Sequence, residues 1–219
     1  FFSTWRLLRE IDKIGPDIIH LHNLHSAYVN LGMLFKYIQR KHIKVVWTLH
    51  DCWAFTGQCP NFSMIGCEKW KTGCNNCQQY KKYPKAYVDR TKEMWKIKKR
   101  LFTLPQEMVV VTPSKWLGGL VKKSFLKKYD VEVINNGIDL SLFSPTESNF
   151  REKFGLKEKK IVLGVSFSWG YEKGLDVFID LASKLGSNYQ IVLVGTTDYI
   201  DTQLPSNIIS IHKTNNQKE

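Results

Sequence analysis

The sequence predicts an α/β fold made of two units, each built on a parallel sheet. Three observations indicate this class. Short apolar runs rich in Val and Ile recur along the chain, helical patterns lie between several of them, and a turn-rich segment divides the series in two. We therefore expect one unit over residues 1–147 and a second unit over residues 148–219.

Seven short runs are expected to form the strands. Each is apolar and partly β-branched, which is typical of strands buried on both faces of a parallel sheet. The runs are Asp17–Leu21, Lys44–Leu49, Met108–Thr112, Val131–Ile134, Lys160–Ser166, Gln190–Val194 and Ile208–Ile211. Apolar residues at helical spacing predict helices over Phe2–Ile14, Ala27–Ile38 and Gly174–Leu185, and another that begins after the N-cap residue Ser114.

Composition limits the kinds of partner. The chain has 219 residues and a net charge of +12, with 23 Lys and Arg against 12 Asp and Glu in residues 1–150, and 9 against 8 in the remainder. A basic first part suggests an anionic partner, either phospholipid, nucleic acid or phosphorylated substrate, although a lysine-rich soluble surface has the same charge. No apolar run reaches the roughly 18 residues of a membrane span. Neither end has the features of a natural terminus, so we expect a piece of a longer protein.

The most informative stretch is the apolar run 45–49, because it ends in His50 and Asp51. In open α/β sheets, ligands bind outside the carboxyl ends of such strands, so these two residues are candidate catalytic residues. The alternative is a histidine that is simply satisfied at a strand end. His20 and His22 alternate to one face of the preceding strand, with His25 nearby. We interpret this group as a polar strand end that lines the ligand crevice, in preference to a metal site.

The second unit contains a candidate phosphate site. The run Lys160–Ser166 leads into a loop that ends Glu172-Lys173-Gly174, directly before a predicted helix. Free backbone N–H groups and the helix dipole favour an anion at a helix N-terminus, and a lysine beside it adds a positive charge. Lys173 is therefore expected to bind phosphate.

The segment 52–83 interrupts the α/β rhythm and contains all five cysteines of the chain. Four of them follow the spacing C-x7-C-x6-C-x2-C, namely Cys59, Cys67, Cys74 and Cys77. Four thiolates can enclose a tetrahedral structural zinc ion, with the sulfur atoms within about 4 Å of one another. Free buried thiols and disulfides are the alternatives. Cys52 is expected to stand apart, near the crevice.

Two lysine-rich stretches, residues 92–102 and 122–128, combine basic and apolar residues. Such a segment can form a helix that lies on an anionic membrane surface, or an ordinary helix whose apolar stripe packs in the core. The sequence supports both interpretations.

Motifs spread over nearly the whole chain point to one family. They are residues 17–23 (DIIHLHN), 48–57 (TLHDCWAFTG), 67–70 (CEKW), 112–116 (TPSKW), 134–139 (INNGID), 143–145 (FSP) and 172–175 (EKGL). Together they resemble the family 4 retaining glycosyltransferases of the GT-B fold. Within that family, the resemblance is to the bacterial exopolysaccharide and colanic-acid-type enzymes.

The resemblance implies two Rossmann-like domains that face each other across a cleft, an acceptor-side domain followed by a donor-binding domain. His50 matches the histidine that contacts the transferred sugar, and Asp51 follows it. Lys173 matches the lysine that neutralises the diphosphate of the departing nucleotide. The implied donor-site residues are Lys173, Gly174, Ser166, Trp169 and Gly195, and the implied acceptor-side residues are His22, Asn23, Ser114, Asn136, Gly137 and Asp139.

The chain departs from the family pattern in two ways. Many relatives carry a Gly-Arg pair at the end of the strand before the lysine, whereas residues 165–170 here are VSFSWG. The family's paired glutamates, E-x7-E, and its amino-terminal glycine-rich loop lie outside this chain. We therefore expect half of each domain, and no activity from this piece alone.

The expected function is transfer of a hexose from a nucleotide-diphosphate sugar to a lipid-linked or polysaccharide acceptor, with retention of configuration, in cell-surface polysaccharide synthesis. Catalysis is expected to need no cofactor. The expected location is the cytoplasm, with peripheral contact at the inner face of the plasma membrane, and no nucleic-acid partner is expected. Two alternatives are a nucleic-acid-binding zinc module and a GT-B relative without acceptor transfer, such as an epimerase.

Overall fold

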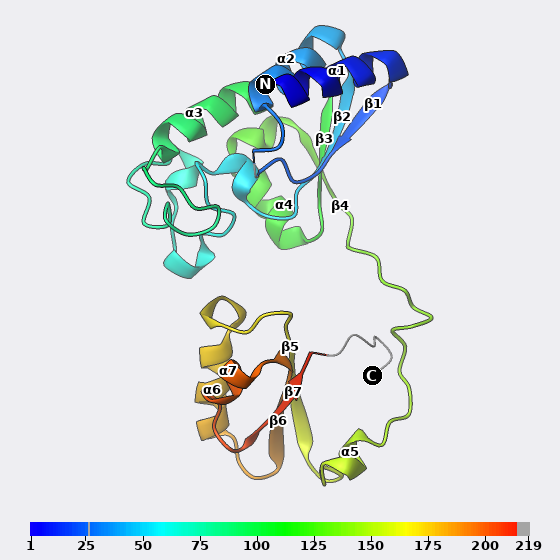
Figure 1. Ribbon diagram of the computed structural model, residues 1–219, viewed down its shortest axis with the longest axis vertical. Coiled ribbons are helices and arrows are strands. Elements are labelled where there is room, and N and C mark those ends of the chain that lie inside the picture. Colours follow the sequence, from blue (N-terminus) through cyan, green and yellow to red (C-terminus); the bar gives the residue numbers. More distant parts are fainter. Residues whose placement is uncertain (26, 214–219) are drawn as a thin grey trace. The chain divides into compact units, whose positions relative to one another are not determined.

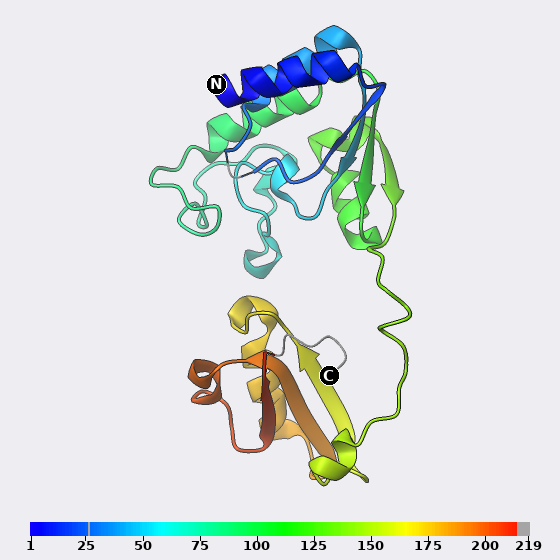
Figure 2. The same cartoon turned by 45° about the vertical axis from the view of Figure 1, so that its right-hand side comes forward.

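The protein consists of two α/β units joined by an irregular segment (Figures 1 and 2). The computed structural model describes residues 1–25 and 27–213. Contacts divide the chain into Phe1–Gly137 and Ile138–Glu219. This division lies earlier in the chain than the boundary at residues 147 and 148 that the sequence suggests. Each unit contains one parallel sheet, as predicted.

The sheet of the first unit has four parallel strands in the order β1, β2, β3, β4 (Figure 1). They are β1 (Ile18–Leu21), β2 (Lys44–Thr48), β3 (Met108–Thr112) and β4 (Asp130–Val133). All four predicted strands are present, and no end differs from the prediction by more than one residue. The register pairs the last residues of neighbouring strands, so their carboxyl ends lie along one edge of the sheet.

Helices and sheet enclose the core of the first unit. The helices are α1 (Phe2–Ile14), α2 (Leu31–Lys41), α3 (Thr91–Phe102) and α4 (Lys115–Val121), with a 3₁₀ helix at Phe125–Lys128. Phe35, Trp47 and Phe102 bring α2, β2 and α3 together, with ring centroids 4.7, 4.8 and 5.7 Å apart. Because the buried Val45 and Trp47 alternate with less buried neighbours, one face of β2 carries most of this core.

Helix α2 begins at Leu31, later than the start near Ala27 that the sequence suggests. The side chain of Asn30 accepts a hydrogen bond of 2.9 Å from the Met33 N–H, which caps the helix at this point. The Asn30 N–H in turn donates to the Thr4 hydroxyl of α1 at 2.8 Å. The cap therefore also fixes the start of α2 against α1.

The cysteine-rich insertion is a folded part of the first unit. It contains three single-turn 3₁₀ helices, Trp53–Phe55, Ser63–Ile65 and Lys69–Lys71. Phe55, Phe62 and Trp70 form an aromatic group whose ring centroids are 4.9, 5.3 and 6.4 Å apart. This group is continuous with the core under the sheet. Aromatic packing therefore replaces regular secondary structure over this stretch.

The second unit has a three-stranded parallel sheet in the order β5, β6, β7. Its elements are β5 (Lys160–Val165), β6 (Tyr189–Thr196), β7 (Ile208–His212), α5 (Phe150–Lys153), α6 (Leu175–Lys184), α7 (Asp198–Asp201) and a 3₁₀ helix at Tyr171–Lys173. Leu175 and Ala182 of α6 join Ile191 and Leu193 of β6 in a separate core. All three predicted strands of this unit are present. In the described part of the chain, no helix combines the length and apolar character needed to cross a bilayer.

Candidate active site

A group of histidines stands at the carboxyl ends of β1 and β2. The Nδ1 atom of His22 lies 3.1 Å from Nε2 of His50, and the two rings stack with centroids 5.4 Å apart. The ring of His20 lies 4.3 Å from that of His22, so these two share a face, as their alternation predicted. Nε2 of His20 lies 2.9 Å from the Thr48 hydroxyl, and burial together with the neighbouring His22 lowers the pKa of His20. His22 and His50 are exposed and therefore accessible to a ligand.

Hydrogen bonds from two aromatic side chains fix the backbone that carries this group. The indole N–H of Trp47 donates to the His22 carbonyl at 2.9 Å, and Trp47 is buried in the core. The hydroxyl of Tyr28 donates to the Asn23 carbonyl at 2.7 Å. The sharp end of β1 is therefore fixed by core and loop contacts, which positions the imidazole of His22.

Asp51 positions its neighbours and does not project into solvent. One carboxylate oxygen lies 3.2 Å from Nε2 of His25, and the other accepts the Trp53 N–H at 2.8 Å. The ring of His25 packs edge-on against Trp53, with centroids 5.7 Å apart. Asp51 thus joins the end of β1 to the start of the cysteine-rich insertion.

Among the described residues, Ser114, Asn136 and Gly137 share no hydrogen bond or ion pair with His20, His22 or His50. Ser114 caps α4, because its hydroxyl accepts the Leu117 N–H at 3.2 Å. Asn136 and Gly137 lie exposed in the irregular segment after β4. Asp139 accepts the Ser141 N–H at 2.9 Å, and the hydrogen bonds from Ser141 lower the pKa of this carboxyl.

The loop between β5 and α6 presents Lys173 at a helix N-terminus. Lys173 is exposed, and its ammonium group has no hydrogen bond or ion pair among residues 1–25 and 27–213. Gly174 begins α6 with a left-handed φ of 72°. No backbone acceptor meets the N–H groups of Asp176 and Val177 in the described part of the chain. The predicted combination of a lysine and free N–H groups is therefore present in the second unit.

Three other donor-site candidates build this loop. A Cβ atom on Gly195 would lie 2.0 Å from the Ser166 carbonyl oxygen, and Gly195 has a φ of +87°. The Ser166 hydroxyl donates to the Ser168 carbonyl at 2.9 Å. The indole N–H of Trp169 donates to the Val194 carbonyl at 3.0 Å. The ends of β5 and β6 are therefore held in close contact, which sets the course of the chain toward Lys173.

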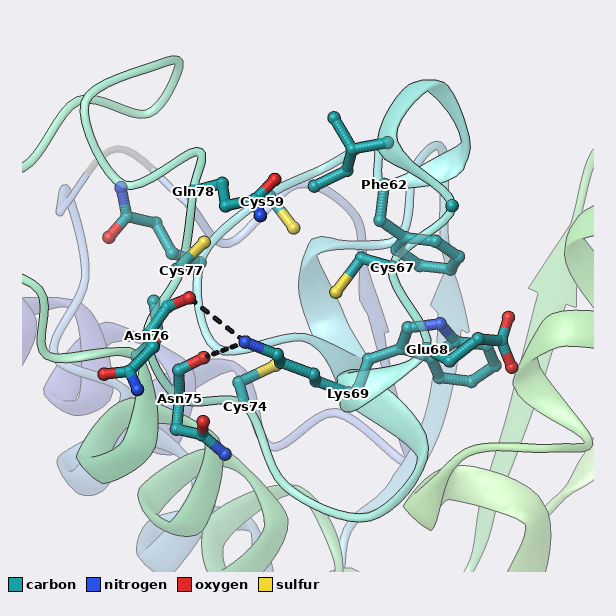
Figure 3. A pocket seen from close by; sticks show the side chains of 15 residues that line it. Cys59, Phe62, Cys67, Glu68, Lys69, Cys74, Asn75, Asn76, Cys77 and Gln78 are labelled. Carbon is teal, nitrogen blue, oxygen red and sulfur yellow. Dashed lines mark hydrogen bonds between the residues drawn. The ribbon is translucent and has the colours of Figure 1, made fainter.

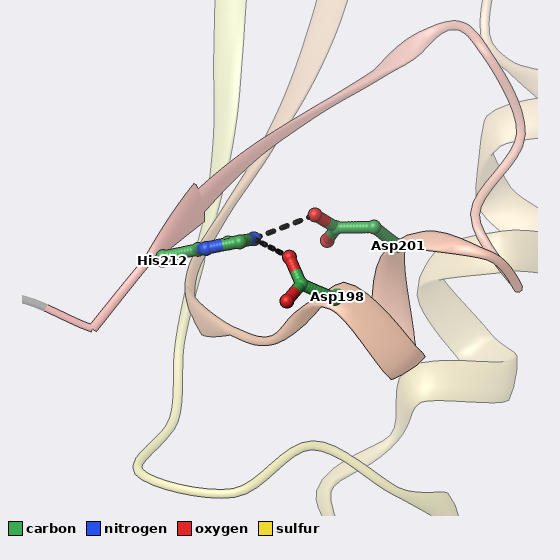
Figure 4. A group of neighbouring side chains, drawn as sticks. All are labelled: Asp198, Asp201 and His212. Atoms are coloured by element: carbon green, nitrogen blue, oxygen red, sulfur yellow. Dashed lines mark hydrogen bonds and ion pairs between the residues drawn. The ribbon is translucent and has the colours of Figure 1, made fainter.

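The sequence analysis missed a carboxylate–histidine group at the end of β7 (Figure 4). Nε2 of His212 lies 2.7 Å from Asp201 and 3.8 Å from Asp198. The hydrogen bond that His212 donates to Asp201 raises the pKa of His212, whereas the hydrogen bonds that Asp201 accepts from Ser210 and His212 lower the pKa of Asp201. The detectable signal was the pair of aspartates three residues apart, followed by a histidine at a strand end. These contacts fasten α7 to β7.

Four cysteines line one pocket of about 260 Å³ in the insertion, namely Cys59, Cys67, Cys74 and Cys77 (Figure 3). All five cysteines are free. Cys52 stands apart from the other four, as predicted, but it is buried in the core of the first unit. Burial raises the pKa of both Cys52 and Cys59 to about 12. The predicted distance of about 4 Å between the sulfur atoms is wrong. Among the described residues, no three of these sulfur atoms lie within 4.8 Å of one another.

The structure decides between the two interpretations of the basic stretch 92–102. In α3 the residues Trp95, Leu101 and Phe102 are buried in the first unit, so the helix packs its apolar face in the core. Lys98 lies on the same face and has no exposed surface. Its spacing of three and four residues from those aromatic and aliphatic neighbours was the signal that could have revealed this burial.

Comparison with known proteins places this geometry in a family. The model of Glycosyltransferase Family 4 matches residues 1–142, more than half of the chain. The chain belongs to glycosyltransferase family 4. It is 34% identical over 140 residues to the putative colanic acid biosynthesis glycosyl transferase WcaC of Escherichia coli K12, covering 58% of this chain and 32% of that protein. It is 28% identical over 217 residues to glycogen synthase of Streptococcus gordonii, covering 88% of this chain and 45% of that enzyme.

Solved structures support a GT-B-type fold for this family 4 chain. Anabaena HepE in complex with UDP matches 95% of this chain and 51% of its own length, with a TM-score of 0.58 and 15% identity. HepE in complex with UDP-glucose matches with a TM-score of 0.52 and 14% identity. The two parallel sheets are thus those of a GT-B-type protein, and the chain spans about half or less of the length of these relatives.

Proposed function

We propose that this chain is part of a retaining glycosyltransferase, which moves a hexose from a nucleotide-diphosphate sugar to a lipid-linked or polysaccharide acceptor. The observation that carries the proposal is the exposed Lys173 beside the free N–H groups at the start of α6. The likeness to WcaC, a putative colanic acid enzyme, supports a role in cell-surface polysaccharide synthesis. Because the relatives are longer, the activity is assigned to the full-length protein.

The donor diphosphate would bind at the α6 N-terminus. Its negative charge grows as the bond to the sugar breaks, so a cation placed there stabilises the transition state more than the bound donor. The loop 165–170 has no arginine. A second cation is nonetheless near, because the Lys213 ammonium lies 4.0 Å from the centroid of the Phe167 ring. Lys213 is our candidate for the charge that the missing arginine supplies in relatives.

His50 would contact the transferred sugar from the first unit. Its Nε2 atom shares a hydrogen bond with His22, and Trp47 holds the His22 backbone. This arrangement restricts the rotation of an exposed imidazole and leaves Nδ1 of His50 available for a sugar hydroxyl. Asp51 would act through His25 and the start of the insertion, as a positioning residue.

The likeness to HepE, which was solved with UDP and with UDP-glucose, makes these two molecules the first probes of donor binding. In the full-length protein, we expect Lys173→Ala to weaken UDP binding measured by calorimetry and to lower turnover by about a hundredfold. Lys184→Ala is the matched control, because Lys184 is the last residue of α6, far along the helix from Lys173, and forms a surface ion pair with Asp180. Equal UDP affinity in wild type and Lys173→Ala would refute the donor site.

His50→Ala should lower turnover by about a hundredfold and change UDP affinity little, since the histidine acts on the sugar. His42→Ala is its control, because His42 is an exposed histidine at the end of α2. The product is assayed as glycan attached to an acceptor, which separates transfer from epimerisation of the donor. An enzyme fully active after His50→Ala would remove this histidine from the mechanism.

The proposed location is the cytoplasm, at the inner face of the plasma membrane, where lipid-linked acceptors are available. The charge of +12 supports electrostatic attraction to anionic lipid. Helix α3 would contribute through charge alone, because its apolar face is in the core. Flotation of the full-length protein with anionic vesicles, compared with neutral vesicles, tests this part of the proposal.

A further inference from the structure

The cysteine pocket is built from three separate stretches of the insertion. Cys59 follows the first 3₁₀ helix, Cys67 precedes the third, and Cys74 and Cys77 follow it. Figure 3 shows their sulfur atoms on the walls of one pocket. The segment 52–90, which has 39 residues and no strand or α-helix, thus surrounds four thiol side chains, and thiolates are soft metal ligands. Such convergence is unusual for thiols that serve only as small apolar side chains.

The backbone approaches these sulfur atoms as it does in metal–thiolate sites. The Gly57 N–H donates to Sγ of Cys74 at 3.1 Å. A Cβ atom on Gly57 would lie 2.9 Å from the Cys74 Cβ and 2.5 Å from the Thr91 carbonyl oxygen, so only glycine permits this approach. The Gln79 N–H donates to Cys77 in the same way. Hydrogen bonds of this kind stabilise a sulfur atom that carries negative charge.

Asp89 fixes the fourth cysteine from outside the pocket. Its carboxylate accepts the Cys77 N–H at 2.7 Å and the Thr91 N–H at 2.9 Å. Because Thr91 begins α3, this carboxylate ties the Cys74–Cys77 turn to the start of a core helix. A bridge of this type orients a ligand without binding the ion itself.

Two lysines lie close to the pocket. The Lys69 ammonium lies in the pocket and donates to the Asn75 and Asn76 carbonyls at 3.1 and 3.2 Å (Figure 3). Lys98 is fully buried, donates to the Trp53 and Thr56 carbonyls, and has no carboxylate within ion-pair distance among the described residues. Burial lowers the pKa of Lys98 well below its ordinary value. A centre held by four thiolates would carry net negative charge, which two lysines this close would help to neutralise.

We propose that Cys59, Cys67, Cys74 and Cys77 bind one metal centre through four thiolates. The centre would stabilise the insertion, which directly follows His50 and Asp51. Its role is therefore structural. Two centres share this chemistry. A zinc ion requires the sulfur atoms to move inward from their present positions, because zinc–sulfur bonds of about 2.3 Å bring them within about 4 Å. An iron–sulfur cluster fills a wider pocket with its own iron and sulfide.

The test is elemental analysis of the full-length protein, purified without chelator and under nitrogen. Zinc at about one ion per chain, or iron with an equal amount of acid-labile sulfide, confirms the centre and tells the two apart. In Cys67→Ser and Cys74→Ser we expect most of the metal to be lost. Cys52→Ala is the matched control and should keep it, because Cys52 is buried outside the pocket.

Alkylation of the unfolded wild-type protein, followed by peptide mapping of Cys52, Cys59, Cys67, Cys74 and Cys77, keeps the proposal falsifiable even where a serine variant does not fold. Alkylation of all five before reduction, together with bound metal, supports the centre. Alkylation of all five without metal above trace level would overturn it. Alkylation of Cys52 alone before reduction would show that the other four form disulfides, and that result would overturn it as well.

Discussion

Replacing Gly195 with alanine tests how the donor-side loop is held. The change adds one methyl group where the end of β6 meets the end of β5. That methyl group would lie 2.0 Å from the Ser166 carbonyl oxygen, whereas real Cβ atoms essentially never come closer than 3.0 Å to such an atom. The two strand ends therefore have to separate by about 1 Å, and the loop that leads to Lys173 has to shift with them.

The expected cost follows from two contributions. The φ of +87° is unfavourable for alanine by about 1 kcal/mol. Overpacking against a backbone atom adds roughly 1–3 kcal/mol, part of it through the hydrogen bond of 3.1 Å from the Ser166 N–H to the Val194 carbonyl. A total of about 3 kcal/mol corresponds to roughly a hundredfold increase in the local opening equilibrium.

Hydrogen exchange of peptides from β5 and β6 measures this directly in the full-length protein. Gly155→Ala is the matched control, because Gly155 has a φ of +66° with no atom within 4 Å of the added Cβ. We expect about 1 kcal/mol there, and roughly a fivefold change in exchange at most. Equal protection of β5 and β6 in the two variants would refute the steric argument.

Three further predictions concern single contacts. Ser114→Ala removes the N-cap of α4 and should lower the free energy of unfolding by about 1 kcal/mol in urea titrations, whereas an unchanged midpoint would contradict the cap. Lys98→Ala leaves a cavity beside Trp53 and unpaired carbonyls, so we expect the free energy of unfolding in urea to fall by about 2–4 kcal/mol. A fall of less than about 0.5 kcal/mol, which is typical of surface substitutions, would be inconsistent with burial of Lys98. Asp201 raises the pKa of His212, so this pair stabilises the fold fully below the ordinary histidine pKa of about 6.5 and loses that contribution as pH rises through the raised value. NMR titration should show the pKa of His212 falling in Asp201→Asn, and a rise would reverse the sign of the argument.

The strands could be predicted from the sequence because each is a short apolar run with a clear boundary. Residues 45–49 illustrate this, since the run ends where His50 begins and the structure ends β2 at Thr48. The start of α2 could not be predicted, because the apolar pattern continues backward from Leu31 to Ala27. What decides the start is the Asn30 cap, which depends on a bond to Met33 that apolar spacing does not reveal.

The candidate site was predictable to a similar degree. Residue type and strand position were enough to select His50, His22 and Lys173. Their partners were not evident, because Asp51 turns toward His25 and Ser114 caps its own helix. The charge of Lys98 did not distinguish it from the other lysines of the stretch 92–102, whereas its position on α3 places it in the core.

The sequence by itself determined the fold class, the strand positions and the family of this protein, because these depend on local patterns and on motifs of adjacent residues. Only the tertiary structure decided which distant residues meet. The stacked histidines follow two strands that pair in register, and the four cysteines line one pocket because aromatic packing folds the insertion back on itself. Neither meeting is a property of sequence spacing, since both depend on the paths that packing and hydrogen bonding impose on the chain between them.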